Sequence, residues 1–208
     1  MSFKHLLFPQ TIKFPDSRYN EKISLHLYFR QPTLIVGGLI QSGDILTSIW
    51  KKGIKSLIPK LFSPKNILLL GLGGGSNALL VSKLYPLAHI TAVEIDPVMI
   101  DISRKYFGTS KIKKLQIINA DALDFARNLK SEKYDLILVD CFEGKYIPKK
   151  LENLDFIQSL KVHSRYTLIN RIFWYEYHHP TQLFMRSLAT RFFFITTHTR
   201  SNLIISLI

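Results

Sequence analysis

The sequence has a single cysteine, Cys141, among its 208 residues. One thiol can neither form a disulfide within the chain nor build a cysteine-based zinc site by itself. No apolar run approaches the roughly 18 residues that cross a bilayer. The start, MSFKHLLFPQ, has too short an apolar stretch and no small-residue cleavage site for a secretory signal. These absences predict a cytoplasmic protein without a membrane span.

Acidic residues are also scarce, because 15 Asp+Glu stand against 28 Lys+Arg and give a net charge of +13. Such an excess favours an anionic partner, with nucleic acid as the first candidate. Basic residues cluster at Lys51–Lys55, Lys111–Lys114 and Lys145–Lys150. No recognisable RNA-binding motif and no Asn-Pro-Pro-Tyr-type amino-methylation loop accompany them. Nucleic acid therefore stays a candidate partner that the sequence does not favour.

No repeat and no Pro/Gly/Ser-rich linker divides the chain, and strand and helix patterns alternate from Asn66 onward. The patterns predict buried strands at 66–71, 90–96, 115–119, 134–140 and 166–174. Helical patterns occupy 76–85, 97–107, 121–130 and 152–162. This alternation predicts right-handed βαβ crossovers and a parallel sheet that helices cover on both faces.

The two ends of the chain have different patterns. Residues 180–191 are predicted to form a helix, followed by strands at 192–199 and 203–208 joined by a polar turn. This terminal hairpin would reverse the last strand of the sheet. Near the start, alternating residues at 22–30 and 33–38 predict a β-hairpin. An amphipathic helix follows from Asp44, a plausible N-cap, with Ile45, Ile49, Trp50, Ile54 and Leu57 on its apolar face.

A glycine-rich segment, GLGGGSN, joins the first buried strand to the helix after it. Gly71, Gly73 and Gly75 permit a tight turn and a close approach of the backbone to a ligand at a helix N-terminus. The segment is not a P-loop, because no Lys-Ser/Thr follows it. Glu94 ends the next strand, where a carboxylate can accept hydrogen bonds from both hydroxyls of a ribose. Together these residues predict a site for a nucleoside-containing cofactor.

Further acidic residues follow the next two strands. Asp121, next to Ala122, either accepts a hydrogen bond from an adenine amino group or caps the helix that follows. Asp140 ends the fourth strand and is followed by Glu143. The carboxyl ends of successive parallel strands are where open α/β sheets bind ligands. Asp96, by contrast, is predicted to cap the helix that starts at Pro97.

Four segments together resemble the spermidine synthase-like branch of the S-adenosylmethionine (SAM)-dependent methyltransferase fold. They are NILLLGLGGGSNALLVSKLYP, ITAVEIDPVMIDISRKYF, INADALDFA and YDLILVDCFEG. The segment LIVGGLIQSGD, with Gln41 and Ser42, also resembles the small N-terminal β-element of that family. The resemblance covers about residues 18–208.

The resemblance implies an α/β, Rossmann-like class I methyltransferase fold. Its sheet would have seven strands, mostly parallel with a reversed last strand, and a small N-terminal β-hairpin element would precede it. We expect residues 1–62 to form the N-terminal element and residues 63–208 the SAM-binding domain. The resemblance also implies a transferase that binds SAM or decarboxylated SAM, with Glu94 on the ribose and Asp121 near the adenine. Its partners would be a small-molecule acceptor and, as a candidate, a second copy of the chain in a homodimer.

Family resemblance leaves methyl and aminopropyl transfer open, because one fold hosts several reactions. Polyamine synthases resemble one another in a G-G-G-D-G loop, whose aspartate binds the amine of decarboxylated SAM; here that position is Gly74. They also carry a Tyr-His pair and acidic residues where this chain has Trp50 and Lys51. The basic loop Lys145–Lys150 likewise disfavours a dicationic acceptor.

We therefore expect methyl transfer from SAM to an unidentified acceptor. Aminopropyl transfer, as in spermidine synthase, is the alternative, and an RNA-binding methyltransferase or a non-catalytic SAM-binding scaffold comes next. Asp140 or Glu143 would accept the proton of the acceptor. Gln41, Trp50 and Trp174 are predicted to contact the acceptor. No metal site is predicted, and Cys141 is interpreted as a small packing residue rather than a nucleophile.

Overall fold

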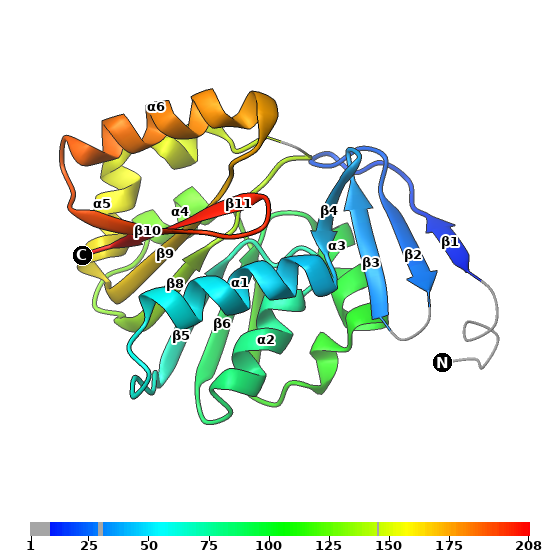
Figure 1. The fold of residues 1–208 in the computed structure, drawn as a ribbon. Coiled ribbons are helices and arrows are strands. Elements are labelled where there is room, and N and C mark those ends of the chain that lie inside the picture. Colours follow the sequence, from blue (N-terminus) through cyan, green and yellow to red (C-terminus); the bar gives the residue numbers. More distant parts are fainter. Residues whose placement is uncertain (1–8, 29–30, 145) are drawn as a thin grey trace.

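The computed structural model describes residues 9–28, 31–144 and 146–208. They form a four-stranded sheet in the order β1-β2-β3-β4 and a seven-stranded sheet in the order β10-β11-β9-β8-β5-β6-β7. Figure 1 shows the small sheet standing at one end of the large one, whose faces carry the helices. Within the described residues, no helix is long and apolar enough to cross a membrane.

The large sheet has the predicted mixed topology. Its strands are β5 (Asn66–Leu70), β6 (His89–Glu94), β7 (Leu115–Asn119), β8 (Tyr134–Val139), β9 (Ser164–Ile172), β10 (Phe194–His198) and β11 (Asn202–Leu207). Neighbouring strands from β9 to β7 are parallel. The last strand, β11, is antiparallel to both β9 and β10 and lies between them. The predicted sheet with a reversed last strand is therefore confirmed.

Helices cover both faces of this sheet. They are α1 (Asp44–Leu57), α2 (Ser76–Leu84), α3 (Pro97–Ile102), α4 (Ala122–Arg127), α5 (Leu154–Val162) and α6 (His178–Ala189). Side chains alternate along a strand, so β5 buries Ile67 and Leu69 against α1 and α2, and Leu68 and Leu70 against the helices opposite. The described residues also form four short helical turns: η2 (Ser103–Phe107), η3 (Thr109–Lys111), η4 (Lys149–Glu152) and η5 (Tyr175–Tyr177).

The prediction that these strands are buried on both faces is wrong for β7. Its residues are half-buried or exposed, whereas those of β11 are buried along the whole strand. β7 lies at the edge of the sheet, where helices cover it only in part. The predicted helix 97–107 is also not uniform, because α3 gives way to the π-helical turn η2, which ends at Gly108 with a left-handed φ of 76°.

The N-terminal hairpin is part of a larger antiparallel sheet. It comprises β1 (Gln10–Lys13), β2 (Ser24–Tyr28), β3 (Gln31–Val36) and β4 (Leu39–Ser42). The predicted hairpin corresponds to β2 and β3, which pair in antiparallel register. One face of the sheet packs Leu25, Leu34 and Val36 against Met99 and Ile102 of α3. The small sheet therefore holds β4, with Gln41 and Ser42, beside the carboxyl ends of the main strands.

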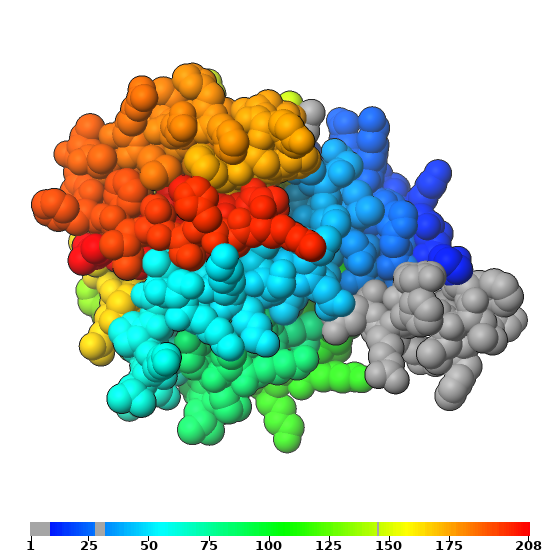
Figure 2. Space-filling view, viewed as in Figure 1, coloured from blue at the N-terminus to red at the C-terminus, as the bar shows by residue number. Residues whose placement is uncertain are grey.

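Helix α1 packs on the large sheet although it precedes the predicted boundary at residue 63. A Cβ added at Gly53 would lie 2.8 Å from Cγ1 of Ile204 in β11, so the helix approaches that strand closely. Figure 2 shows α1 directly against the C-terminal hairpin. Two local expectations are wrong: the N-cap is Gly43 rather than Asp44, and Ile45 is exposed while Leu46 is buried in its place. The division into residues 1–62 and 63–208 stays a prediction.

Candidate functional site

The glycine-rich loop after β5 is folded tightly against the end of β8. Gly71 has φ 88°, and a Cβ there would lie only 2.3 Å from the carbonyl oxygen of Asp140. Gly75 has φ 93° and is the N-cap of α2. Left-handed φ values and contacts this close favour glycine, because any other side chain would be strained or would clash. The loop therefore brings the carboxyl ends of β5 and β8 together.

Glu94, the last residue of β6, holds this loop in place. Its Oε2 accepts hydrogen bonds from the amides of Leu72 and Gly73, both at 2.9 Å. Its Oε1 accepts one from the amide of Asp96 at 3.0 Å. Burial raises the pKa of Glu94, and the three amide donors oppose that rise. The carboxylate predicted to bind a ribose thus lies in the predicted place and also organises the loop beneath it.

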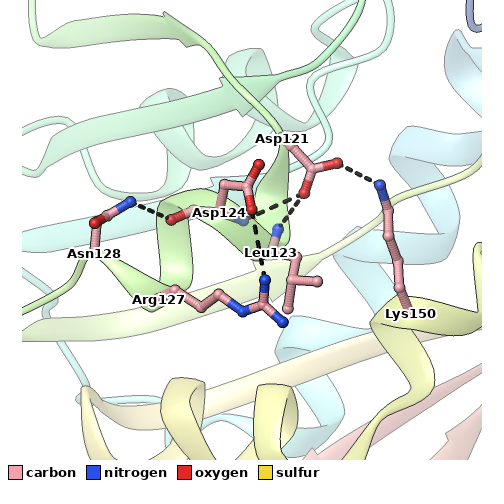
Figure 3. A network of polar contacts seen from close by, with 6 residues as sticks. All are labelled: Asp121, Leu123, Asp124, Arg127, Asn128 and Lys150. Atoms are coloured by element: carbon pink, nitrogen blue, oxygen red, sulfur yellow. Dashed lines mark hydrogen bonds and ion pairs between the residues drawn. The ribbon is translucent and has the colours of Figure 1, made fainter.

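Asp121 caps α4 and pairs with Lys150 of the helical turn η4 (Figure 3). Its Oδ1 accepts hydrogen bonds from the amides of Leu123 at 2.8 Å and Asp124 at 3.3 Å. Its Oδ2 forms an ion pair with Nζ of Lys150 at 2.5 Å. Burial alone would raise the pKa of Asp121, but these donors outweigh it and hold the pKa below its usual range. The capping role is confirmed, and the adenine role stays a prediction.

The cap gives a first testable consequence. Asp121→Ala is expected to lower the free energy of unfolding by about 1 kcal/mol, because α4 loses its side-chain cap. Asp121→Asn is the matched control, since asparagine caps equally well and an exposed ion pair contributes only about 0–1 kcal/mol. Chemical denaturation of the two variants measures the difference. Equal destabilisation by both would show that the ion pair, rather than the cap, carries the effect.

Asp140 accepts three side-chain hydrogen bonds, all from neutral donors. Its Oδ2 accepts from the indole Nε1 of Trp50 at 2.9 Å and from the amide Nδ2 of Asn77 at 2.7 Å. Its Oδ1 accepts from Nδ2 of Asn170 at 2.7 Å, and Asn202 donates in turn to Asn170. Burial raises the pKa of Asp140, and the three neutral donors oppose it. The carboxylate is thus fixed in place, and no cation among the described residues pairs with it.

Two pockets meet at Asp140. The β6–β8 pocket lies at the carboxyl ends of β6, β7 and β8, and its walls include Gly71, Gly73, Val93, Glu94, Ile95, Met99, Asp121, Ala122, Cys141, Glu143 and Lys150. The α1–β9 pocket is lined chiefly by apolar side chains, among them Leu39, Ile40, Leu46, Ile49, Ile172 and Trp174. Gln41, Asp140 and Phe142 line both. The arrangement allows a group bound in one pocket to reach a group bound in the other.

The remaining predicted site residues are placed unevenly. Gln41 donates from Nε2 to the carbonyl of Gly144 at 2.6 Å. Trp174 is at the rim of the α1–β9 pocket, 39% exposed. Trp50 is fully buried and reaches the site only through its bond to Asp140. Glu143 is exposed and lines only the β6–β8 pocket, while Gly75 lines neither. The structure thus gathers most of the predicted set but gives its members different positions.

In the sequence, Lys51 and the basic loop Lys145–Lys150 disfavour a dicationic acceptor, but none of their described lysines lines the α1–β9 pocket. Lys51 is on the side of α1 away from the α1–β9 pocket, in a separate groove. Helical periodicity causes this, because Leu46 and Ile49 face the pocket and Lys51 therefore does not. Lys150 lines the β6–β8 pocket but is paired with Asp121. Lys145 lies outside the described residues.

Sequence reasoning missed four contributors: Asn77, Phe142, Asn170 and the pairing of Lys150. Only Asn77 could have been found from the sequence, because it directly follows the glycine-rich loop. Burial raises the pKa of Cys141 well above its usual value, as expected for a packing residue rather than a nucleophile. Among the described residues, no group of three or more His, Cys, Asp or Glu side chains is placed to hold a metal ion.

Parts of the sequence are similar to a known protein family and to two groups of transferases. Residues 53–166 match the family model described as spermine/spermidine synthase domain. A polyamine aminopropyltransferase of Vibrio vulnificus is 41% identical over 105 residues, which are 49% of this chain and 35% of that protein. The eEF1A lysine and N-terminal methyltransferase of Mus musculus is 40% identical over 83 residues, 38% of this chain and 12% of that protein. The chain thus covers only about a third or less of these relatives.

Solved structures give the same picture. Spermidine synthase from Thermotoga maritima superposes with a TM-score of 0.74 at 17% identity, over 95% of this chain and 72% of that one. Human methyltransferase-like protein 13, solved in complex with SAH, superposes with a TM-score of 0.60 at 25% identity, over 69% of this chain and 71% of that one. The comparison with spermidine synthase supports the fold alone.

Proposed function

Because the chain belongs to the spermine/spermidine synthase domain family, we propose that it is a transferase that binds SAM in the β6–β8 pocket. It transfers a methyl group to an acceptor in the α1–β9 pocket. We favour methyl over aminopropyl transfer because the atoms packed around Gly74 leave no room for a side chain there.

The side chains of the β6–β8 pocket fit an adenosyl group. Glu94 offers a carboxylate where ribose hydroxyls are bound in such sheets. Asp121 and the N-terminal residue of α4, Ala122, lie at the end of the neighbouring strand. Val93, Ile95, Met99 and Phe142 supply apolar walls for a base, as small-molecule pockets usually do. One structure that the chain resembles was solved with SAH.

Gly74 has no room for the aspartate that polyamine synthases of this family are expected to carry there. A Cβ at Gly74 would lie 2.7 Å from Cβ of Ser42 and 2.8 Å from Cε2 of Phe107. The amide of Gly74 already donates to Oγ of Ser42 at 2.8 Å. The ammonium of decarboxylated SAM would thus lack its carboxylate partner. An unpaired buried cation is costly, so this loop favours SAM as the donor.

Asp140 is the proton acceptor in this proposal. SAM, when bound, supplies a methyl group on a sulfonium that is already activated, so the protein's task is mostly positioning. Trp50, Asn77 and Asn170 hold the carboxylate between the two pockets. Oδ1 accepts a single hydrogen bond in the described structure, so it keeps a lone pair for the proton of the acceptor. The raised pKa of Asp140 makes it a stronger base than an exposed aspartate.

The α1–β9 pocket favours an acceptor other than a diamine. Asp140 is its only carboxylate among the described lining residues, and Arg200 is on its rim. A diamine would leave one ammonium facing apolar side chains or an arginine, which costs free energy. An acceptor with an apolar body and one nucleophilic nitrogen or oxygen near Asp140 satisfies both features. Trp50 then acts as a positioning residue for Asp140, while Trp174 and Gln41 contact the acceptor.

Aminopropyl transfer remains the second candidate for a specific reason. Asp140 and Glu143 both line the β6–β8 pocket, so two carboxylates are available there to bind or deprotonate an amine. The 41% identity to a polyamine aminopropyltransferase favours the same activity. The chain covers 35% of that relative, so the likeness does not extend to the whole of it.

Calorimetric titration with SAM, decarboxylated SAM and methylthioadenosine separates the candidates. We expect SAM to bind at least about tenfold more tightly than decarboxylated SAM, a difference of about 1.4 kcal/mol. Glu94→Ala should abolish binding of all three, whereas Glu132→Ala, which removes an exposed carboxylate, should not. Circular dichroism checks that Glu94→Ala still folds. Tighter binding of decarboxylated SAM would restore aminopropyl transfer, and binding of none would refute the cofactor site.

A further inference from the structure

A groove away from both pockets gathers much of the excess positive charge. It runs between α1, α2 and the segment from η2 to the start of β7. Six cations from separate parts of the chain line it: Lys51, Lys83, Arg104, Lys105, Lys111 and Lys113. Lys114 is a seventh, and its ammonium donates to the carbonyl of Leu87 at 2.8 Å. Seven of the 28 Lys+Arg of the sequence therefore meet at one groove.

These cations have no acidic partners within the described part of the chain. The ion pairs there join Arg127, Lys150, Arg171 and Arg191 to carboxylates, and none involves the groove. Asp44 is the only acidic residue among the described residues that line it. A lysine surface that serves solubility is normally interspersed with acids. The groove instead presents a concentrated positive field, which attracts polyanions.

Aromatic rings lie among the cations. Tyr85 and Tyr106 line the groove and are half-buried. The ammonium of Lys105 is 5.3 Å from the centroid of the Tyr106 ring. Cations that contact phosphates, together with rings on which bases stack, are the features by which proteins bind single strands. An acidic peptide would use the cations but would leave these rings without a stacking partner.

From these features we propose that the groove binds single-stranded nucleic acid, with the cations on its phosphates and the tyrosines against its bases. The site is separate from the transfer chemistry. On α1, Asp44, Thr47 and Lys51 face the groove, whereas Leu46 and Ile49 face the α1–β9 pocket. The groove therefore docks a strand on the outside of α1, and the proposal does not depend on which group the enzyme transfers.

Fluorescence anisotropy with a labelled oligouridylate of about 12 nucleotides, within the span of known single-strand sites, tests the proposal. The full chain is titrated at several salt concentrations. Each phosphate contact to a single strand contributes about −0.7 to the slope of log K against log salt, so a steep slope is expected. A DNA strand of matching length should bind with a similar slope, because the contacts are to phosphates and ring faces.

Two triple variants with the same charge change make the test specific. The groove variant is Lys105→Gln, Lys111→Gln and Lys113→Gln. The control variant is Lys60→Gln, Lys130→Gln and Arg186→Gln. All six side chains are exposed, so both variants should fold. We expect the groove variant to reduce the steepness of the slope by about 2 and to weaken binding at least tenfold, with the control close to the parent chain.

Three outcomes would overturn the proposal. The first is either no binding of the oligonucleotide or binding whose affinity does not depend on the salt concentration. The second is an equal loss in both triple variants, which would make the effect one of net charge. The third is displacement of the oligonucleotide by polyglutamate as efficiently as by unlabelled RNA, which would identify an acidic protein as the fitting partner. Calorimetry with SAM on the groove variant should give the parent value, which separates this result from a failure of the cofactor site.

Discussion

Replacement of Asp140 by asparagine is expected to reduce methyl transfer by at least about 100-fold, because a positioned base contributes about 10²–10⁴ to such rates. The amide keeps the size of the carboxylate but cannot accept a proton at neutral pH. Its NH₂ group would also face donors from among Trp50, Asn77 and Asn170, which bond the present carboxylate. Transfer of labelled methyl from SAM into a protein-free extract of small molecules measures the loss.

Asp135→Asn is the matched control, because Asp135 lies near the start of β8, whereas Asp140 directly follows the end of that strand. Its Oδ2 accepts hydrogen bonds from the amides of Lys65 and Asn66, far from either pocket. Both variants should bind SAM about as tightly as the parent chain. Retained transfer in Asp140→Asn would contradict the role of this carboxylate, as would an equal loss in Asp135→Asn.

The same carboxylate predicts how transfer depends on pH. If Asp140 accepts the proton as proposed, transfer requires its ionised form, so the rate should fall as pH is lowered through its pKa. Burial raises that pKa, so the fall occurs above the usual aspartate value of about 3.9. The raised pKa of Asp140 has the opposite effect on the stability of the fold, which it favours at low pH. The folded state binds the proton more strongly, so Asp140 contributes stability at low pH and loses it as pH rises from the unfolded to the folded pKa.

Gly71→Ala is expected to be the most destabilising single change in the site, at about 2–4 kcal/mol. The left-handed φ of 88° costs an alanine about 1 kcal/mol. Its Cβ would also lie 2.3 Å from the carbonyl oxygen of Asp140. Backbone cannot yield as a flexible side chain can, so relief of this clash costs about 1–3 kcal/mol more. The glycine loop and the end of β8 would move apart.

Gly108→Ala isolates the two contributions to that cost. Gly108 has a similar φ of 76°, but nothing lies within 4 Å of an added Cβ. Its replacement should cost only the backbone strain, about 1 kcal/mol. Guanidinium unfolding of both variants gives the difference, which measures how closely β5 and β8 approach. Equal destabilisation would mean that the contact at Gly71 relaxes without cost.

Much of the site could be predicted because parallel topology places strand ends together. Once the sequence indicates βαβ units, Glu94, Asp121 and Asp140 must lie along one edge of the sheet. The bounds of β7, Leu115–Asn119, match the prediction, and so does the capping of α3 by Asp96. These features depend on local patterns of burial and capping that a single segment carries. The short strands β1 and β4 were missed, because four residues give too little alternation.

The environment of Asp140 could not be predicted in this way. Its donors Trp50, Asn77 and Asn170 are 90, 63 and 30 residues from it in the sequence, and no motif joins them. The gathering of basic residues at one groove could not be predicted either. Lys51 and Lys113 belong to separate clusters in the sequence, and only the packing of α1 and α2 brings them to one groove. Long-range convergence of this kind requires the tertiary structure.

A crystal structure of the protein with SAH is the most direct test of the central claim. The account predicts the adenosyl group in the β6–β8 pocket, with its ribose hydroxyls at the carboxylate of Glu94 and its base between Asp121 and Phe142. The sulfur should face Asp140, at the junction with the α1–β9 pocket. SAH bound elsewhere, or with its ribose away from Glu94, would contradict the account.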